Sequence, residues 1–151
     1  MRKYSVIGNA TCTQSATLPL ITLISTANIR PRINDVVLGS GASPVDQNGR
    51  FALQRCTTAG TPGSSLTPQA LNPDDPAALA GSGLAIFSAG PTLTANAFVL
   101  QLAGAMRSTI RWVPKDGHEI VLPATASYGV ALMALQVSAA WDLSMMIHYT
   151  E

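Results

Sequence analysis

Few residues in this chain have a type and spacing that could support catalysis or metal binding. His118 and His148 are the only histidines, and neither has a second His, Cys or carboxylate at ligand spacing. A zinc site needs three or four such ligands. Asp74-Asp75 resembles a carboxylate pair for acid–base chemistry, but prolines flank it and Asp75 suits a helix N-cap. We therefore predict no metal and no cofactor.

Other chemical motifs are also incomplete. No serine lies in a Gly-x-Ser-x-Gly elbow, and Gly81-Ser82-Gly83 lacks the lysine and the following helix of a phosphate-binding loop. Trp112 and Trp141 could stack on a sugar ring. In a chain with 5% aromatic residues, however, a tryptophan is more often a core or interface anchor. The chain is therefore not predicted to be an enzyme.

The two cysteines, Cys12 and Cys56, lie in separate strand-like segments. Two cysteines do not form a disulfide framework. Buried free thiols are the favoured interpretation, and a bridge within the chain or between subunits is the alternative.

Composition indicates a chain that associates with other subunits. Hydrophobic residues make up 47% of the 151 residues and charged residues only 11%, and the mean hydropathy is +0.26. The usual charged share is about 25%. Because obligate interfaces are apolar and poor in charge, we expect part of the surface to be buried against other copies.

The same numbers disfavour several classes of partner. A membrane helix needs about 18 or more consecutive apolar residues, and the apolar runs here are broken earlier by Thr, Gly or Pro. The net charge of +1 gives no electrostatic footprint for nucleic acid. Arg2-Lys3 precedes only Tyr4–Ile7 before glycine and polar residues interrupt, which is too short for a signal peptide. We predict neither a membrane nor a nucleic-acid partner.

Arginine is the preferred basic residue: seven of the nine basic residues are arginine. A guanidinium pairs well with carboxylates across a contact. One interpretation is that arginines in or beside strands, together with Trp141, hold subunits together, with Asp35, Glu119 and Asp142 as possible partners. The alternative is that they cover solvated strand faces. The arginines chosen for the intersubunit interpretation are Arg30, Arg32, Arg107 and Arg111.

Strand-like runs separated by turn residues cover most of the chain, and helical periodicity never lasts more than about two turns. Arg50–Cys56 alternates cleanly, with Phe51, Leu53 and Arg55 on one face. In Asp142–Thr150, Leu143, Met145, Ile147 and Tyr149 alternate with Ser144, Met146, His148 and Thr150. This pattern predicts an all-β antiparallel sandwich or barrel, in one domain spanning 1–151. The expected strands are Tyr4–Cys12, Leu20–Ser25, Arg30–Leu38, Arg50–Cys56, Leu84–Ser88, Ala95–Leu102, Ser108–Val113, His118–Leu122, Gly129–Val137 and Asp142–Thr150.

Arg107–Gly129 is the most informative stretch of the sequence. Two strand-like runs flank Lys115-Asp116-Gly117, which is typical of a tight turn. We expect a β-hairpin in which Trp112 is a packing anchor, supported by Ile110 and Ile120 across the hairpin.

Thr57–Gly83 is a long irregular segment that contains four prolines. Within it, Asp75 suits an N-cap, Pro76 suits the first helical position and Gly81 suits the stop. We expect one short helical turn there. Long ordered loops in compact domains are usually functional or make contacts.

A family resemblance runs over roughly Ile29 to the C-terminus, and it is carried by Ile29–Asp35, Leu66–Ala78, Arg111–Pro114 and Gly117–Ala126. The chain resembles small β-sandwich proteins encoded in tailed-phage structural gene clusters, which are similar to capsid decoration, or cement, proteins. The resemblance implies a jelly-roll-like domain, often a homotrimer, on the outer surface of the virion, with the major capsid protein as its partner. It carries over no catalytic residue.

The match is weaker before Thr26, so that 1–26 is either an arm or a first strand. We expect either this segment or the Thr57–Gly83 loop to make the main contact with the capsid lattice. A trimeric jelly-roll module that binds a glycan or receptor, as in a phage spike or fibre, is the alternative function. Within the loop, the apolar anchors would be Leu66, Leu71 and Leu79, and Asp74 and Asp75 would meet basic groups.

Overall fold

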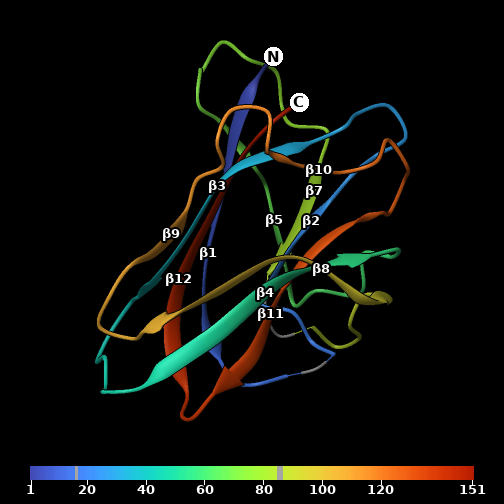
Figure 1. Cartoon of the computed structure of the whole chain (residues 1–151). Helices are drawn as coiled ribbons and strands as arrows, with labels where there is room; N and C mark the ends of the chain where they lie inside the picture. The colour runs from blue at the N-terminus through green and yellow to red at the C-terminus, as the bar shows by residue number, and fades with distance from the viewer. Residues whose placement is uncertain (16, 85–86) are drawn as a thin grey trace.

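The computed structural model describes residues 1–15, 17–84 and 87–151, and these residues form two antiparallel sheets packed together (Figure 1). The first sheet has the order β10-β3-β12-β1-β6, with β9 also paired to β3, and the second has the order β5-β7-β2-β11-β4-β8. The predicted all-β sandwich is confirmed. The first sheet comprises β1 (Lys3–Cys12), β3 (Arg32–Ser40), β6 (Gln69–Ala70), β9 (Ile110–Trp112), β10 (Ile120–Val121) and β12 (Trp141–Thr150). The second comprises β2 (Ile21–Ile24), β4 (Asn48–Cys56), β5 (Ser64–Leu66), β7 (Gly81–Leu84), β8 (Leu93–Ala105) and β11 (Gly129–Val137).

The core lies between the sheets and is built from alternate residues of the long strands. In β12 the predicted alternation is confirmed, since every second side chain from Trp141 to Tyr149 is buried. Trp141 packs edge-on against Phe51 of the other sheet, with ring centroids 5.3 Å apart. Tyr4 and Tyr149 stack with centroids 5.6 Å apart. These contacts join the two sheets through one hydrophobic core.

Strands from the first half of the chain pair with strands from the second half, the first strand with the last. β1 pairs with β12, β2 with β11, β3 with β9 and β10, and β4 with β8, all antiparallel. The chain is therefore a long antiparallel ribbon folded into two layers. β1 pairs with β12 from Lys3 to Cys12, so this part of the N-terminal segment is a strand of the sandwich.

The predicted hairpin around Lys115-Asp116-Gly117 is wrong, although the turn itself forms. His118 N donates to Lys115 O over 2.9 Å, and Gly117 has a φ of 82°. β9 and β10, however, do not pair with each other. Both pair with the same strand, β3, as two pieces of one interrupted edge strand. The loop Val113–Glu119 leaves the sheet between them, because β3 already supplies the hydrogen bonds that the two runs need.

The short helical turn expected at Asp75–Gly81 is also absent, and the described residues contain no helix. Two amides that a helix would have used bond elsewhere. Leu79 N and Ala80 N both donate to the Glu151 carboxylate. Asp75 N donates to Asn72 O in a tight turn. Long-range hydrogen bonds therefore outcompete the local helix signal.

The Thr57–Gly83 segment is built into both sheets. β5 pairs with β7 in the second sheet, and β6 pairs with β1 in the first. The Gly81-Ser82-Gly83 run makes up most of β7 and pairs with β2. A Cβ on Gly83 would lie 2.7 Å from Pro62 Cβ, so the close approach of the two segments requires glycine there. Residues 85–86 of the predicted Leu84–Ser88 strand lie outside the described residues.

Candidate functional site

The segment that follows β6 lies beside both chain termini, at one end of the sandwich (Figure 1). Leu71 N donates to Lys3 O over 2.9 Å. The Tyr4 hydroxyl donates to Pro76 O over 3.1 Å. The Glu151 carboxylate accepts from Leu79 N at 3.1 Å and from Ala80 N at 2.8 Å. Thr67–Ala80, which we call the terminal segment, is thus fixed to β1 and to Glu151 after β12.

The terminal segment presents apolar and acidic side chains to solvent. Leu71 is 51% exposed and Leu79 is 57% exposed. Asp74 is exposed and Asp75 is partly buried. Leu66, which was predicted to act with them, lies in β5 and packs partly against the core. The structure therefore places four of the five proposed contact residues on one segment and assigns Leu66 to packing.

Two of the four arginines assigned to subunit contacts make ion pairs within the chain. Arg111 forms two hydrogen bonds with the buried Asp35 carboxylate, at 3.0 and 2.7 Å. This hydrogen bonding raises the pKa of the Arg111 guanidinium above its usual value. Arg107 pairs with Asp46, and both side chains are largely exposed. The carboxylate partner of Arg111, Asp35, therefore belongs to the same chain.

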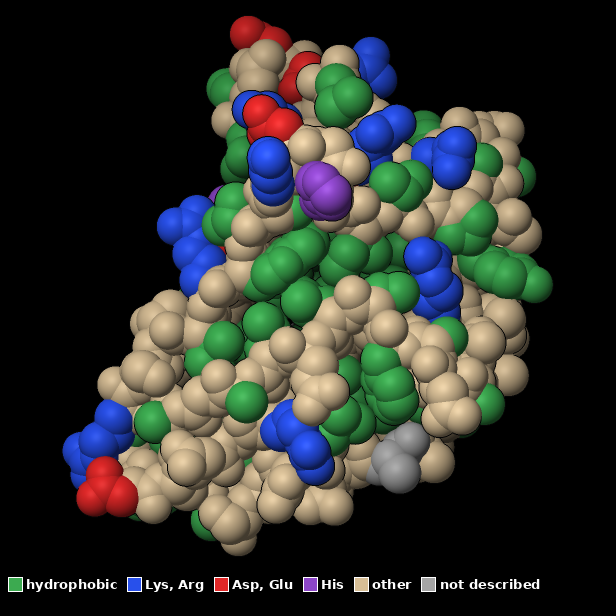
Figure 2. Space-filling view, viewed as in Figure 1, with side chains coloured by type: hydrophobic (Ala, Val, Ile, Leu, Met, Phe, Trp, Pro, Cys, Tyr) green, Lys and Arg blue, Asp and Glu red, His purple; other side chains and the backbone are tan. Residues whose placement is uncertain are grey.

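Arg30 and Arg32 are exposed, and no ion pair joins either to a carboxylate among the described residues. Figure 2 shows Lys and Arg side chains scattered over one face rather than gathered in a single patch. Glu119, a predicted partner, instead accepts a hydrogen bond from Gly117 N. Backbone hydrogen bonds of this kind lower the pKa of Glu119.

Trp141 was predicted to lie at a subunit contact, and its burial contradicts this. The side chain is 0% exposed and packs against Phe51. Trp141 lies in the core of its own chain because it is the first residue of β12 and its side chain points inward. Trp112, predicted as the packing anchor, is only partly buried.

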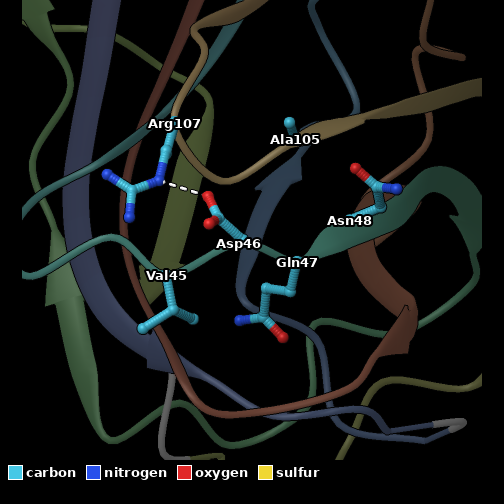
Figure 3. A pocket seen from close by; sticks show the side chains of 6 residues that line it. All are labelled: Val45, Asp46, Gln47, Asn48, Ala105 and Arg107. Atoms are coloured by element: carbon cyan, nitrogen blue, oxygen red, sulfur yellow. Dashed lines mark hydrogen bonds and ion pairs between the residues drawn. The ribbon is translucent and has the colours of Figure 1, made fainter.

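At the opposite end of the sandwich, Gln47 forms hydrogen bonds with the loop after β11 and with the loop after β8. The sequence did not predict this contact. The side-chain oxygen of Gln47 accepts from Ser138 Oγ and Ala139 N, each at 2.7 Å. Its amide nitrogen donates to Ala139 O, and Met106 N donates to Gln47 O. A shallow pocket beside it is bridged by the Asp46–Arg107 ion pair (Figure 3). The hydrogen bonds of Gln47 indicate a structural role for this end.

Ser5, His148 and Asp35 lie side by side across three strands on the outer face of the first sheet. His148 Nδ1 is 3.7 Å from Asp35 Oδ2. The order resembles nucleophile, base and acid, but Ser5 Oγ is buried and has no hydrogen-bond partner among the described residues. A nucleophile must be reachable by substrate, so this row does not form a catalytic site.

Both cysteines are buried and unpaired, as the favoured interpretation expected. Burial raises the pKa of Cys12 to about 12 and that of Cys56 to about 11. The described residues contain no cluster of His, Cys, Asp and Glu suited to a metal ion. Within the same residues, no helix has the length and apolar character to cross a membrane.

Comparisons with protein-family models, with curated proteins and with solved structures gave no match.

Proposed function

We propose that this chain is a viral structural protein, a capsid decoration protein that binds the outer surface of a phage head as a multimer and stabilises the shell. The observation that carries the proposal is the terminal segment. It is fixed by hydrogen bonds to both termini and presents Leu71, Asp74 and Leu79 outward. A pre-ordered segment loses little entropy when it binds.

The jelly-roll topology is part of the proposal, and the strand pairing supports it. With β5, β6 and β7 set aside, and with β9 and β10 taken as one interrupted strand, one sheet has the order β9/β10-β3-β12-β1 and the other β2-β11-β4-β8. Within this set of eight strands, only β4 and β8 follow each other along the chain in the same sheet. A ribbon of eight strands rolled in this way is the arrangement of jelly-roll capsid domains.

Mass action provides the proposed mechanism. A protein that binds only the assembled shell stabilises that state relative to the dissociated one. If several copies act together, as in the homotrimer that the family resemblance implies, weak contacts gain strength because each copy raises the local concentration of the next.

The glycan-binding alternative is disfavoured by where the aromatic residues lie. Trp141, Tyr4 and Tyr149 are buried in the core, and Trp112 is partly buried. Phe98, at 46% exposure, and Tyr128, at 40%, are the exposed aromatic side chains. A sugar platform needs aromatic rings gathered at loop tips, and Phe98 lies within β8.

Binding to empty phage heads tests the proposal. Leu71→Ser with Leu79→Ser removes apolar surface from the terminal segment without touching its backbone bonds. We expect this variant to sediment with heads at least about tenfold more weakly than the native protein. Leu18→Ser with Val45→Ser is the matched control, since Leu18 and Val45 lie outside the terminal segment and are similarly exposed, at 41% and 46%. Equal binding by both folded variants would move the contact away from the terminal segment, and no binding by the native protein would remove the proposed function.

A further inference from the structure

β8 is an edge strand of the second sheet. Within residues 1–15, 17–84 and 87–151 it pairs only with β4. Apart from that pairing, the backbone groups of Gln101–Gly104 make no hydrogen bond within the described parts of the chain. An unpaired strand edge is a template for another extended strand.

The other sheet edges are short or interrupted. β5 has three residues and β6 has two. The edge formed by β9 and β10 is broken by Val113–Glu119, which carries Lys115 and Asp116. β8 has thirteen residues, but irregularities interrupt its pairing with β4 between Leu93 and Leu100, so that its regularly paired stretch is Leu100–Ala105. No charged residue occurs from Pro91 to Met106. Bulges and charges both protect an edge strand from further pairing, and Leu100–Ala105 has neither.

The side chains that β8 turns inward are incompletely covered. Leu100 and Leu102 are only partly buried, whereas Phe51 and Leu53, which face them from β4, are at most 1% exposed. Trp112, on the facing edge of the first sheet, is also partly buried. Figure 2, viewed from the side on which β8 lies in Figure 1, shows hydrophobic side chains gathered across the middle of the molecule. A strand added to β8 would cover this open side of the sandwich.

We propose that the strand is β8 of a second copy of this chain, paired antiparallel across a two-fold axis. The chemistry is self-complementary, because two uncharged edges do not repel and each brings leucines to the other's open side. A two-fold axis perpendicular to the sheet keeps inward residues opposite inward residues. With the axis at Leu102, Leu100 lies opposite Gly104, and Gln101 lies opposite Ala103. Residues opposite each other have Cβ atoms about 4.5–5.5 Å apart.

This contact is independent of capsid binding. It joins two monomers, or two trimers of the kind that the family resemblance implies, so the assembly holds an even number of chains. The second sheets of the two copies become one continuous sheet.

Mass in solution tests the contact. Gln101→Lys with Ala103→Lys places two charges on the outer face of the β8 edge, where the second copy would bring two more. The control, Ala124→Lys with Ala126→Lys, adds the same charge at exposed loop positions. We expect the native protein and the control to have a mass of two or six chains by light scattering, and the edge variant to have half that mass with unchanged circular dichroism. A native mass of one or three chains, or an edge variant of native mass, would overturn the contact.

A cross-link gives a second reading that does not depend on the lysine variant folding. Ala103→Cys, which is exposed on the outer face one residue from the axis, should be joined to its symmetry mate by a short bifunctional thiol reagent, since the native cysteines are buried. Ala105→Cys, further from the axis, should be joined much less. Equal or absent cross-linking of both would contradict the two-fold pairing.

Discussion

At the scale of single residues, burial decides which tryptophan matters. Trp141 is 0% exposed and packs on Phe51, whereas Trp112 is only partly buried beside the open side of the sandwich. The alternation of Asp142–Thr150 was visible in the sequence. That Trp141 continues this alternation inward, and reaches the other sheet, depends on the packing of β12 over β4.

Trp141→Ala should lower the free energy of unfolding by about 3–5 kcal/mol, because it removes a fully buried indole and leaves a cavity. Trp112→Ala should cost clearly less. Urea titration of both variants measures the difference. A larger loss for Trp112→Ala would restore it as the packing anchor and contradict the packing described for Trp141.

The two buried thiols should make stability depend on alkaline pH. Their pKa values in the folded chain, about 12 for Cys12 and about 11 for Cys56, lie above the ordinary value of about 8.5. Above pH of about 8.5 the unfolded chain therefore holds fewer protons than the folded chain, and stability falls as pH rises towards the folded-state pKa values. Urea midpoints from pH 8 upwards should fall less steeply in Cys12→Ala/Cys56→Ala than in the native protein. Parallel slopes would show that the thiols do not contribute.

At the scale of elements, β9 and β10 form one edge strand with a loop inserted into it. The Lys115–Gly117 turn connects two pieces that each depend on β3 for their hydrogen bonds. The register of this edge is therefore set by β3 and not by the turn.

Insertion of Gly-Gly-Ser-Gly between Asp116 and Gly117 tests this arrangement. Because the loop does not set the register of β9 and β10, the insertion should lower the free energy of unfolding only by the added loop-closure entropy, about 0.4 kcal/mol. In a tight hairpin the same insertion would disturb strand pairing and cost much more. Chemical denaturation of the insertion variant distinguishes the two cases, and a loss of several kcal/mol would argue for direct pairing.

The terminal segment depends on one carboxylate after β12. Glu151→Ala removes the acceptor of Leu79 N and Ala80 N. We expect amide hydrogen exchange at these two residues to accelerate by about tenfold, as loss of a charge-assisted hydrogen bond implies. Asp142→Ala, which removes an exposed carboxylate elsewhere, is the control. Unchanged exchange in Glu151→Ala would mean that other contacts order the segment.

At the scale of the whole molecule, low charge and high apolar content leave several large hydrophobic side chains in solvent. Ile7 is 58% exposed on the outer face of β1, and Phe98 is 46% exposed on β8. Leu71 and Leu79 add apolar surface on the terminal segment. These residues lie on separate parts of the fold.

Association should make thermal stability depend on protein concentration. If the native state is a multimer and the unfolded state is monomeric, Tm rises with concentration by mass action. We expect a measurable rise over about a hundredfold range of concentration for the native protein, and a smaller one for Gln101→Lys/Ala103→Lys. A Tm that stays constant for the native protein would contradict the association inferred from its composition.

The sequence by itself determined the class of the fold. Period-two alternation fixes which residues can face a core, and Gly129–Val137 forms the strand predicted for it, residue for residue. These features are local, because neighbouring residues in a strand point to opposite faces.

Only the tertiary structure decided which strands pair and which polar groups meet. The two strand-like runs within Arg107–Gly129 were expected to pair with each other, yet both pair with β3. Asp75–Gly81 carried helix capping signals, yet Glu151 takes two of its amides. Arg111 was assigned a partner in another subunit, and Asp35 of its own chain binds it. Each of these outcomes rests on hydrogen bonds between residues far apart in the sequence, and local propensity carries no information about such distant partners.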